Sequence, residues 1–242
     1  MRDLHLCILA VFAALIALPA FARDNVKKLV FNFAGHARTL YLFVPEKDGS
    51  LPVVVLLHGS GHNGEIMVDA WKNLAAQEGF IVVGPDAFDS AGWDPKTDPP
   101  DFLHAAVEQA AASHAVDRNR VYLFGHSSGA EYALILAILD SHSFASITVH
   151  AGALQPGFFK LFAYAGRRLP IAIWVGDRDP FFPLDLVKAT KKEFESNGFP
   201  IELSIIPNHD HNYYVISDDV NAKAWDFLKK AQLRAIGISD QH

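Results

Sequence analysis

Residues 121–139 read VYLFGHSSGAEYALILAIL, and this stretch predicts a strand, a sharp turn and a helix in immediate succession. Its first four residues form a short apolar run that is typical of a buried strand. The turn has the G-x-S-x-G pattern, with Ser127 between Gly125 and Gly129. A turn of this kind between a strand and a helix strains its serine and exposes the hydroxyl, so Ser127 is the candidate nucleophile.

An acid that orients the base is expected just past a later strand, since sites of this kind use the chain order serine, acid, histidine. Residues 171–175 (IAIWV) have the apolar run of a buried strand, and Asp177 and Asp179 follow them. Asp179 is favoured because it has G-x-x-D spacing from Gly176 and precedes a Pro-aromatic turn. Asp177 better fits a residue that structures the loop or pairs with Arg178.

The base that activates the serine is expected after the last strand. Residues 201–206 form that strand, and the segment PNHDHNYY follows it at residues 207–214. We favour His211 as the base, while His209 stays open as the alternative or as a residue in contact with the site. An H-x-H pair also occurs in metal sites, but the sequence offers no clear third ligand, so no metal or other cofactor is expected.

Two backbone N–H groups are expected to bind the oxyanion of an acyl intermediate. One belongs to Ser128, at the amino end of the predicted helix, where the helix dipole favours negative charge. The other is expected in the loop HGSGHNG at residues 58–64, where Ser60 is the candidate. The glycines of this loop allow its backbone to approach the acyl oxygen closely, and His58 is expected to hold the loop in place.

Along the chain, apolar runs alternate with helical patterns, which predicts an α/β fold with a mostly parallel sheet and helices on both faces. A single catalytic domain is expected over residues 23–242, with at most a short cap at residues 154–168 and no large lid domain. We expect strands at residues 38–44, 53–57, 80–84, 121–124, 147–150, 171–175 and 201–206. We expect helices at residues 71–78, 99–115, 128–139, 184–197 and 220–232.

The first 22 residues are expected to form a secretory signal peptide rather than part of the domain. An apolar run at residues 6–18 follows a short polar start, and Ala20 and Ala22 form an A-x-A cleavage site. The run is shorter than the roughly 20 apolar residues that a membrane-spanning helix needs. The mature chain is therefore expected to be secreted or periplasmic, without stable membrane insertion and without Cys7.

Composition and charge exclude several other classes of protein. The chain has 242 residues, of which 50% are hydrophobic and 20% charged, and this balance excludes a disordered, collagen-like or coiled-coil protein. Its single cysteine excludes a small disulfide-rich scaffold. Because the formal net charge is −6, nucleic acid is not an expected partner.

These motifs resemble those of the α/β-hydrolase superfamily over nearly the whole mature chain. Residues 38–64, 79–93 and 117–137 are similar to the secreted poly(3-hydroxybutyrate) depolymerase and feruloyl esterase-like group. The segment DHNYY at residues 210–214 is similar to the catalytic-histidine segment of S-formylglutathione hydrolase-type esterases, which supports His211. Many of the secreted depolymerases and feruloyl esterases carry disulfides and binding modules; this sequence has neither, and the departure favours small or soluble esters.

The resemblance implies a serine esterase in which Ser127, His211 and Asp179 form the catalytic triad. Its substrates would be carboxylic esters with short or aromatic acyl groups, on sugars or on hydroxyalkanoate oligomers. A serine peptidase or acyltransferase of the same fold is the first alternative, and a catalytically silent binding module is the second. The candidate residues of the substrate pocket are aromatic and lie in the expected site loops: Trp93, Phe181 and Tyr213.

Overall fold

A computed structural model describes residues 25–233, so the expected signal peptide at residues 1–22 lies outside the described residues. The strands are β1 (Lys27–Phe33), β2 (His36–Phe43), β3 (Leu51–Leu57), β4 (Ile81–Pro85), β5 (Val116–His126), β6 (Ile147–His150), β7 (Ile171–Gly176) and β8 (Ile201–Ile206). The α-helices are α1 (Gly64–Glu78), α2 (Pro100–Ala111), α3 (Ser128–Leu139), α4 (Leu184–Ser196) and α5 (Ser217–Leu228). Two 3-10 helices are η1 (Pro156–Tyr164) and η2 (Tyr213–Val215).

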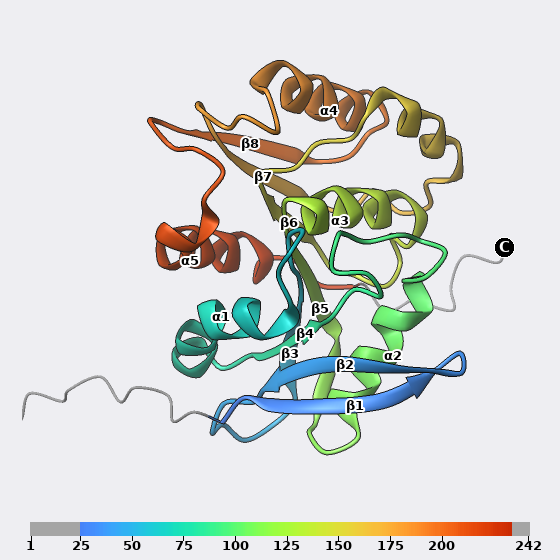
Figure 1. Ribbon diagram of the computed structural model, residues 1–242, viewed down its shortest axis with the longest axis vertical. Coiled ribbons are helices and arrows are strands. Elements are labelled where there is room, and N and C mark those ends of the chain that lie inside the picture. The colour runs from blue at the N-terminus through green and yellow to red at the C-terminus, as the bar shows by residue number, and fades with distance from the viewer. Residues whose placement is uncertain (1–24, 234–242) are drawn as a thin grey trace, which may run out of the picture.

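The strands form one sheet in the order β1-β2-β4-β3-β5-β6-β7-β8 (Figure 1). From β4 to β8 every neighbouring pair is parallel, whereas β2 runs antiparallel to both β1 and β4. The expected α/β fold with a mostly parallel sheet is therefore confirmed. Because β3 to β8 run in the same direction, the loops that follow them meet at the carboxyl edge of the sheet, where open α/β proteins place their sites.

Helices cover both faces of the sheet (Figure 1). Val53 and Val55 of β3 belong to the apolar core beneath α2, α3 and α4, while Val54 and Leu56 belong to the core beneath α1 and α5. Every residue of β3 is buried, because each face of the strand packs against helices. Within residues 25–233, no helix combines the length and the apolar character needed to cross a membrane.

The first strand of the sheet was not predicted from the sequence. β1 pairs with β2 in a hairpin whose turn consists of Ala34 and Gly35, both with positive φ, at 50° and 84°. Two positive φ values match the turn that suits the twist of a two-residue hairpin. The side chains of β1 alternate only between exposed and half-buried positions, so this edge strand lacks the continuous apolar run that revealed the central strands.

Several elements differ in length from the sequence-based expectation. The expected strand at residues 121–124 is the buried part of β5, which extends over its polar first residues because Val116 pairs with Leu51 of β3. The helix expected at residues 71–78 begins seven residues earlier, since the side chain of Asn63 caps it by accepting from the Ile66 N–H (3.2 Å). The helix expected at residues 99–115 ends at Ala111.

The start of α1 packs directly on β4 because glycine occupies both sides of the contact. A Cβ on Gly64 would lie 1.9 Å from the carbonyl oxygen of Gly84. A Cβ on Gly84 would lie 2.5 Å from the carbonyl oxygen of Gly64 and 2.7 Å from the side chain of Val68. These distances leave no room for a methyl group, so the backbones of helix and strand touch at this point.

We therefore expect Gly64→Ala to lower the free energy of unfolding by about 1–3 kcal/mol, or more if the helix cannot shift, because the added methyl overpacks the contact. Urea unfolding measures this value. The matched control is Gly157→Ala, since a Cβ on Gly157 meets nothing within 4 Å and its φ is not in the left-handed range. The control should leave stability unchanged or raise it by up to about 1 kcal/mol. Equal stability of the two variants would contradict the contact.

Candidate active site

Ser127 occupies the turn between β5 and α3, at the carboxyl edge of the sheet. Its backbone has φ +56° and ψ −119°, a conformation that is costly for a residue with a side chain. The Ser127 N–H donates a hydrogen bond to the carbonyl oxygen of His150, at the end of neighbouring β6 (3.1 Å). The Ala130 and Glu131 N–H groups in turn donate to the Ser127 carbonyl, so both sides of the strained residue are fixed.

The two glycines of the motif make this turn possible. A Cβ on Gly125 would lie 2.3 Å from the carbonyl oxygen of Gly129. A Cβ on Gly129 would lie 2.3 Å from the carbonyl oxygen of Leu57, at the end of β3. Strand and helix thus cross with their backbones in contact, as the sequence pattern predicted.

The structure brings Ser127, His211 and Asp179 together. The Ser127 Oγ lies 2.9 Å from His211 Nε2, and the His211 Nδ1 lies 2.8 Å from Asp179 Oδ2. The second carboxylate oxygen of Asp179 accepts hydrogen bonds from the N–H groups of Phe181 (2.9 Å) and Phe182 (3.0 Å). Burial acts to raise the pKa of Asp179, but the hydrogen bonds from His211 and the two amides outweigh it and lower that pKa.

Gly176 lets the loop that carries the histidine approach the loop that carries the acid. A Cβ at this position would lie 2.1 Å from the carbonyl oxygen of His209. The Arg178 N–H donates to the same oxygen (3.0 Å), and the Asp177 N–H donates to Ile206 at the end of β8 (3.1 Å). These backbone contacts by themselves fix the distance between the two loops, independently of the side-chain hydrogen bonds.

Asp177 and His209, the alternative candidates for the acid and the base, form no hydrogen bond with Ser127 or His211 in the described part of the chain. Asp177 is exposed, whereas Asp179 is 8% exposed. The imidazole of His209 is buried, and its Nε2 lies 3.2 Å from Nε2 of His150 rather than beside Ser127. The geometry therefore supports Asp179 over Asp177 and His211 over His209.

The β3–α1 loop (residues 58–63) lies against the serine. A Cβ on Gly59 would lie only 3.1 Å from the Cβ of Ser127. Within residues 25–233, neither the Ser60 N–H nor the Ser128 N–H donates a hydrogen bond to another residue. Both amides are thus free to bind an oxygen atom beside Ser127, which is what an oxyanion site needs.

A cavity of about 490 Å³ opens beside His211. Phe181, one of the expected pocket residues, lines it; this side chain is 67% exposed, and its ring meets the His211 ring edge-on at 4.8 Å between centroids. The remaining lining residues are His62, His126, Pro180, Asp210, Asn212 and Tyr214. The cavity is open and combines aromatic surface with polar groups.

The two other expected pocket residues do not line this cavity, and the structure corrects one of them, Tyr213. Tyr213 is fully buried, and its hydroxyl donates to Asn221 and accepts from the indole N–H of Trp71 (2.8 Å), so it belongs to the core beneath the site. Trp93 is half-buried behind the β3–α1 loop, where its indole N–H donates to the carbonyl oxygen of His58 (2.9 Å). An aromatic residue in a loop can point either way; here Tyr213 points inward, whereas Trp93 is half-buried and does not line this cavity.

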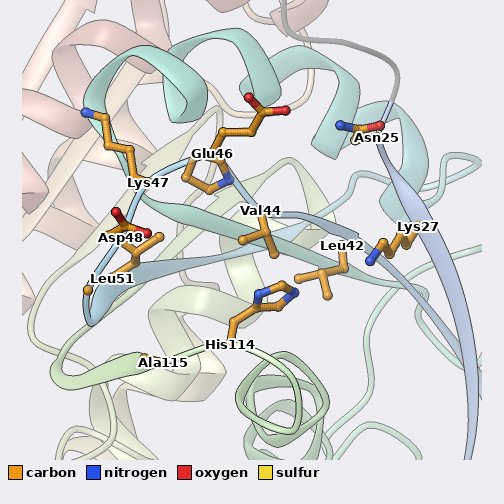
Figure 2. A pocket seen from close by; sticks show the side chains of 12 residues that line it. Asn25, Lys27, Leu42, Val44, Glu46, Lys47, Asp48, Leu51, His114 and Ala115 are labelled. Atoms are coloured by element: carbon orange, nitrogen blue, oxygen red, sulfur yellow. The ribbon is translucent and has the colours of Figure 1, made fainter.

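Two further cavities are not lined by His211, although the first of them shares His62 with the cavity beside His211. One of about 520 Å³ lies between His62 and the start of the β4–α2 loop (residues 86–99). Another, of about 670 Å³, lies at the opposite edge of the sheet, where Leu51 begins β3 and where His114 and Ala115 precede β5 (Figure 2). Since Ser127 lies at the carboxyl edge, the cavity of Figure 2 is not part of this site.

Three buried histidines form a chain behind Ser127 and His211. Nδ1 of His126 lies 3.2 Å from Nδ1 of His150, and Nε2 of His150 lies 3.2 Å from Nε2 of His209. In each pair one nitrogen donates and the other accepts, which neutral imidazoles can do. The sequence analysis did not single out His126 or His150, although both end neighbouring parallel strands.

Burial keeps the rings of His126 and His150 neutral. Burial, together with nearby His211, lowers the pKa of His126 to about 3. Burial, together with His126 and His209, lowers the pKa of His150 to about 2. A charge on either ring would lose most of its solvation, and within residues 25–233 no carboxylate is hydrogen-bonded to either ring to compensate.

Comparison with known proteins agrees with the fold described above. A profile of the alpha/beta hydrolase family matches residues 54–209. Acetylxylan esterase A of Aspergillus awamori is 27% identical over 136 residues, which cover 50% of this chain and 44% of that protein. Feruloyl esterase B of Neurospora crassa is 26% identical over 132 residues, which cover 49% and 45% of the respective chains. The match thus spans less than half of each of these relatives.

Solved structures share the fold at lower identity. A fluorophosphonate-binding serine hydrolase of Staphylococcus aureus matches with a TM-score of 0.73 at 13% identity, covering 84% of this chain and 98% of that one. A ferulic acid esterase of Anaeromyces mucronatus matches with a TM-score of 0.69 at 17% identity, covering 85% and 90%. At such identities the likeness extends to the fold alone.

Because His126 and His150 have lowered pKa values in the folded state, we expect the free energy of unfolding to fall in acid. Below pH 6.5 the unfolded chain protonates His126 and His150, whereas the folded chain does not until pH about 3 and about 2. Stability is therefore complete above 6.5 and falls as the pH drops, by about 1.4 kcal/mol per pH unit for each ring. Urea unfolding at pH 7, 6 and 5 measures the slope, and His150→Gln should reduce it. An unchanged slope in that variant would contradict a neutral buried His150.

Proposed function

Because this chain belongs to the alpha/beta hydrolase family, we propose that it is a serine esterase that hydrolyses carboxylic esters through an acyl-enzyme. The observation that carries the proposal is the line of hydrogen bonds from Ser127 through His211 to Asp179. This arrangement supplies a nucleophile, a base within hydrogen-bond distance of it, and an acid that orients the base.

The reaction begins when the Ser127 Oγ attacks the ester carbonyl and His211 Nε2 takes the serine proton. The new C–O bond places negative charge on the former carbonyl oxygen, and the free N–H groups of Ser60 and Ser128 bind that charge. His211 then gives its proton to the departing alcohol as the ester C–O bond breaks. Water then attacks the acyl-enzyme while His211 takes the water proton. His211 returns this proton to the Ser127 Oγ as the bond between the serine and the acyl group breaks.

Asp179 stabilises the protonated His211 that forms in both steps. Its carboxylate stays ionised because its pKa is lowered and two backbone amides hold its other oxygen. The hydrogen bond to Nδ1 also leaves Nε2 as the acceptor that faces Ser127. The acid thus selects both the tautomer and the orientation of the ring.

The substrates we propose are esters with short or aromatic acyl groups, borne by sugars or by hydroxyalkanoate oligomers. The open cavity beside His211, with exposed Phe181 at its wall, is compatible with an aromatic or short chain. The similar proteins named acetylxylan esterase and feruloyl esterase support the same range. The expected signal peptide supports a secreted or periplasmic site of action.

The first test is the hydrolysis of p-nitrophenyl esters from acetate to palmitate by the purified protein and by Ser127→Ala. We expect turnover of the short esters and a loss of at least about 10⁴-fold in the variant, because the nucleophile is gone. A fluorophosphonate probe should label the native protein and not the variant. Labelling with amide turnover but no ester turnover would favour a peptidase, and no labelling at all would favour a binding module.

The role of the acid is tested by a matched pair of variants. Asp179→Asn should lower kcat by about 10⁴-fold, because the amide favours the wrong tautomer of His211 and cannot stabilise its charged form. Asp177→Asn makes the same chemical change in the exposed neighbour and should leave kcat within about twofold. Steady-state kinetics on the best ester measures both. A larger loss in Asp177→Asn than in Asp179→Asn would exchange the two roles.

A further inference from the structure

The β4–α2 loop is tied to the β3–α1 loop by three hydrogen bonds. The Gly61 N–H donates to the carbonyl oxygen of Ser90 (2.7 Å). The Ala87 N–H donates to Nε2 of His58 (3.0 Å), and the indole N–H of Trp93 donates to the carbonyl oxygen of His58 (2.9 Å). One loop therefore fixes the residues on both sides of Ser60.

His58 is arranged to accept such a bond. Its ring is 1% exposed, and its Nδ1 lies 2.9 Å from the carbonyl oxygen of Gly59, to which it donates. The donation by Nδ1 leaves Nε2 as the acceptor for the Ala87 N–H. Burial lowers the pKa of His58, which keeps the ring in this neutral form.

Ser60 has little intrinsic rigidity of its own. It is exposed and lies between Gly59 and Gly61, the latter with φ +76°. Gly92 of the β4–α2 loop lies against it from outside, since a Cβ there would be 3.9 Å from the Ser60 Oγ and 3.5 Å from the Ser128 Cβ. The direction of the Ser60 N–H is therefore set by contacts with the neighbouring loop.

The β4–α2 loop is itself held by a buried carboxylate. Asp98 is 0% exposed and pairs with the guanidinium of Arg38, which is 4% exposed. The same carboxylate accepts from the N–H groups of Phe88 (2.8 Å) and Asp94 (3.3 Å) and from the hydroxyl of Thr97 (3.2 Å). Three donors from across the loop, together with the guanidinium of Arg38 in β2, thus converge on one side chain.

Arg38 connects this loop to the sheet. From its position in β2, its guanidinium donates to the carbonyl oxygens of Asp86 (3.0 Å) and Thr97 (3.1 Å), which lie near the two ends of the loop. The guanidinium also lies 3.5 Å from the centroid of the Phe102 ring at the start of α2. Arg38 therefore holds the two ends of the loop together and anchors the loop to β2.

We propose that Asp98, Arg38 and Trp93 are positioning residues that hold the Ser60 N–H in place to bind the oxyanion. They act through the β4–α2 loop and do not touch the reacting atoms. The inference rests on the proposed esterase function. It assigns the oxyanion site a support that originates in β2 and in the β4–α2 loop.

The test uses Trp93→Phe, which keeps an aromatic ring and removes the N–H that holds the His58 carbonyl. Steady-state rates are measured for an ester and for its thionoester, in which sulfur replaces the carbonyl oxygen. Sulfur accepts hydrogen bonds weakly, so the ratio of the ester rate to the thionoester rate reports the quality of the oxyanion site. We expect kcat for the ester to fall about tenfold, KM to stay within about twofold, and the ratio to fall about tenfold.

The matched control is Trp225→Phe, because the Trp225 indole N–H donates to Glu78 (2.9 Å) on the opposite face of the sheet. It should alter stability while leaving kcat and the rate ratio unchanged. Asp98→Asn, where it folds, should lower the ratio as Trp93→Phe does, and the double variant should lower it by less than the product of the two effects.

The outcomes separate the inference from the proposed function. If the native protein hydrolyses esters and Trp93→Phe lowers both rates equally, the ratio is unchanged and the positioning role is overturned while the esterase stands. A rise in KM without a change in kcat would instead place Trp93 in contact with substrate and would also overturn the inference. If the native protein hydrolyses no ester and Ser127 is not labelled by fluorophosphonate, both proposals fail together.

Discussion

The backbone crossing of β5 and α3 is the constraint on which the rest of this site depends. Gly125, Gly129 and the end of β3 meet without room for a side chain, and this contact forces Ser127 into a conformation with φ +56°. Such strain costs about 1–3 kcal/mol and persists only where the surrounding structure determines it. Here the hydrogen bond from the Ser127 N–H to His150 ties the strained residue to the next strand. The position of the hydroxyl is therefore a property of the sheet rather than of a loop.

The other groups reach Ser127 because parallel strands bring their carboxyl ends to one edge. Asp179 and His211 follow adjacent strands, and the backbone contact at Gly176 sets the distance between their loops. The site holds one buried group charged and keeps other buried groups neutral. Asp179 is held charged by three hydrogen bonds, whereas His126 and His150 are held neutral by burial. One carboxylate thus faces the reacting histidine without competing buried charges behind it.

The fold and the candidate nucleophile could be predicted because both depend on short-range patterns. Buried strands appear as continuous apolar runs, and the turn at Ser127 needs glycine at fixed spacings. The prediction failed where the pattern was weaker or said nothing about direction. The edge strand β1 has only partly buried side chains, and the sequence does not show that Tyr213 is buried beneath the site or that the Trp93 indole binds the β3–α1 loop. Loop aromatic residues have no periodicity from which orientation can be inferred.

The sequence by itself determined the order of the site motifs along the chain. It identified the strand that ends in the serine turn and the later strands that precede the acid and the histidine. The sequence favoured Asp179 over Asp177, but only the tertiary structure shows that the Asp179 carboxylate lies beside His211, because loop contacts turn that side chain inward. Only the tertiary structure paired Arg38 with Asp98, which lie 60 residues apart, and joined three histidines behind the site. The reason is physical: local sequence sets backbone conformation and burial, whereas hydrogen-bond partners between distant segments exist only once the sheet has brought their ends to one edge.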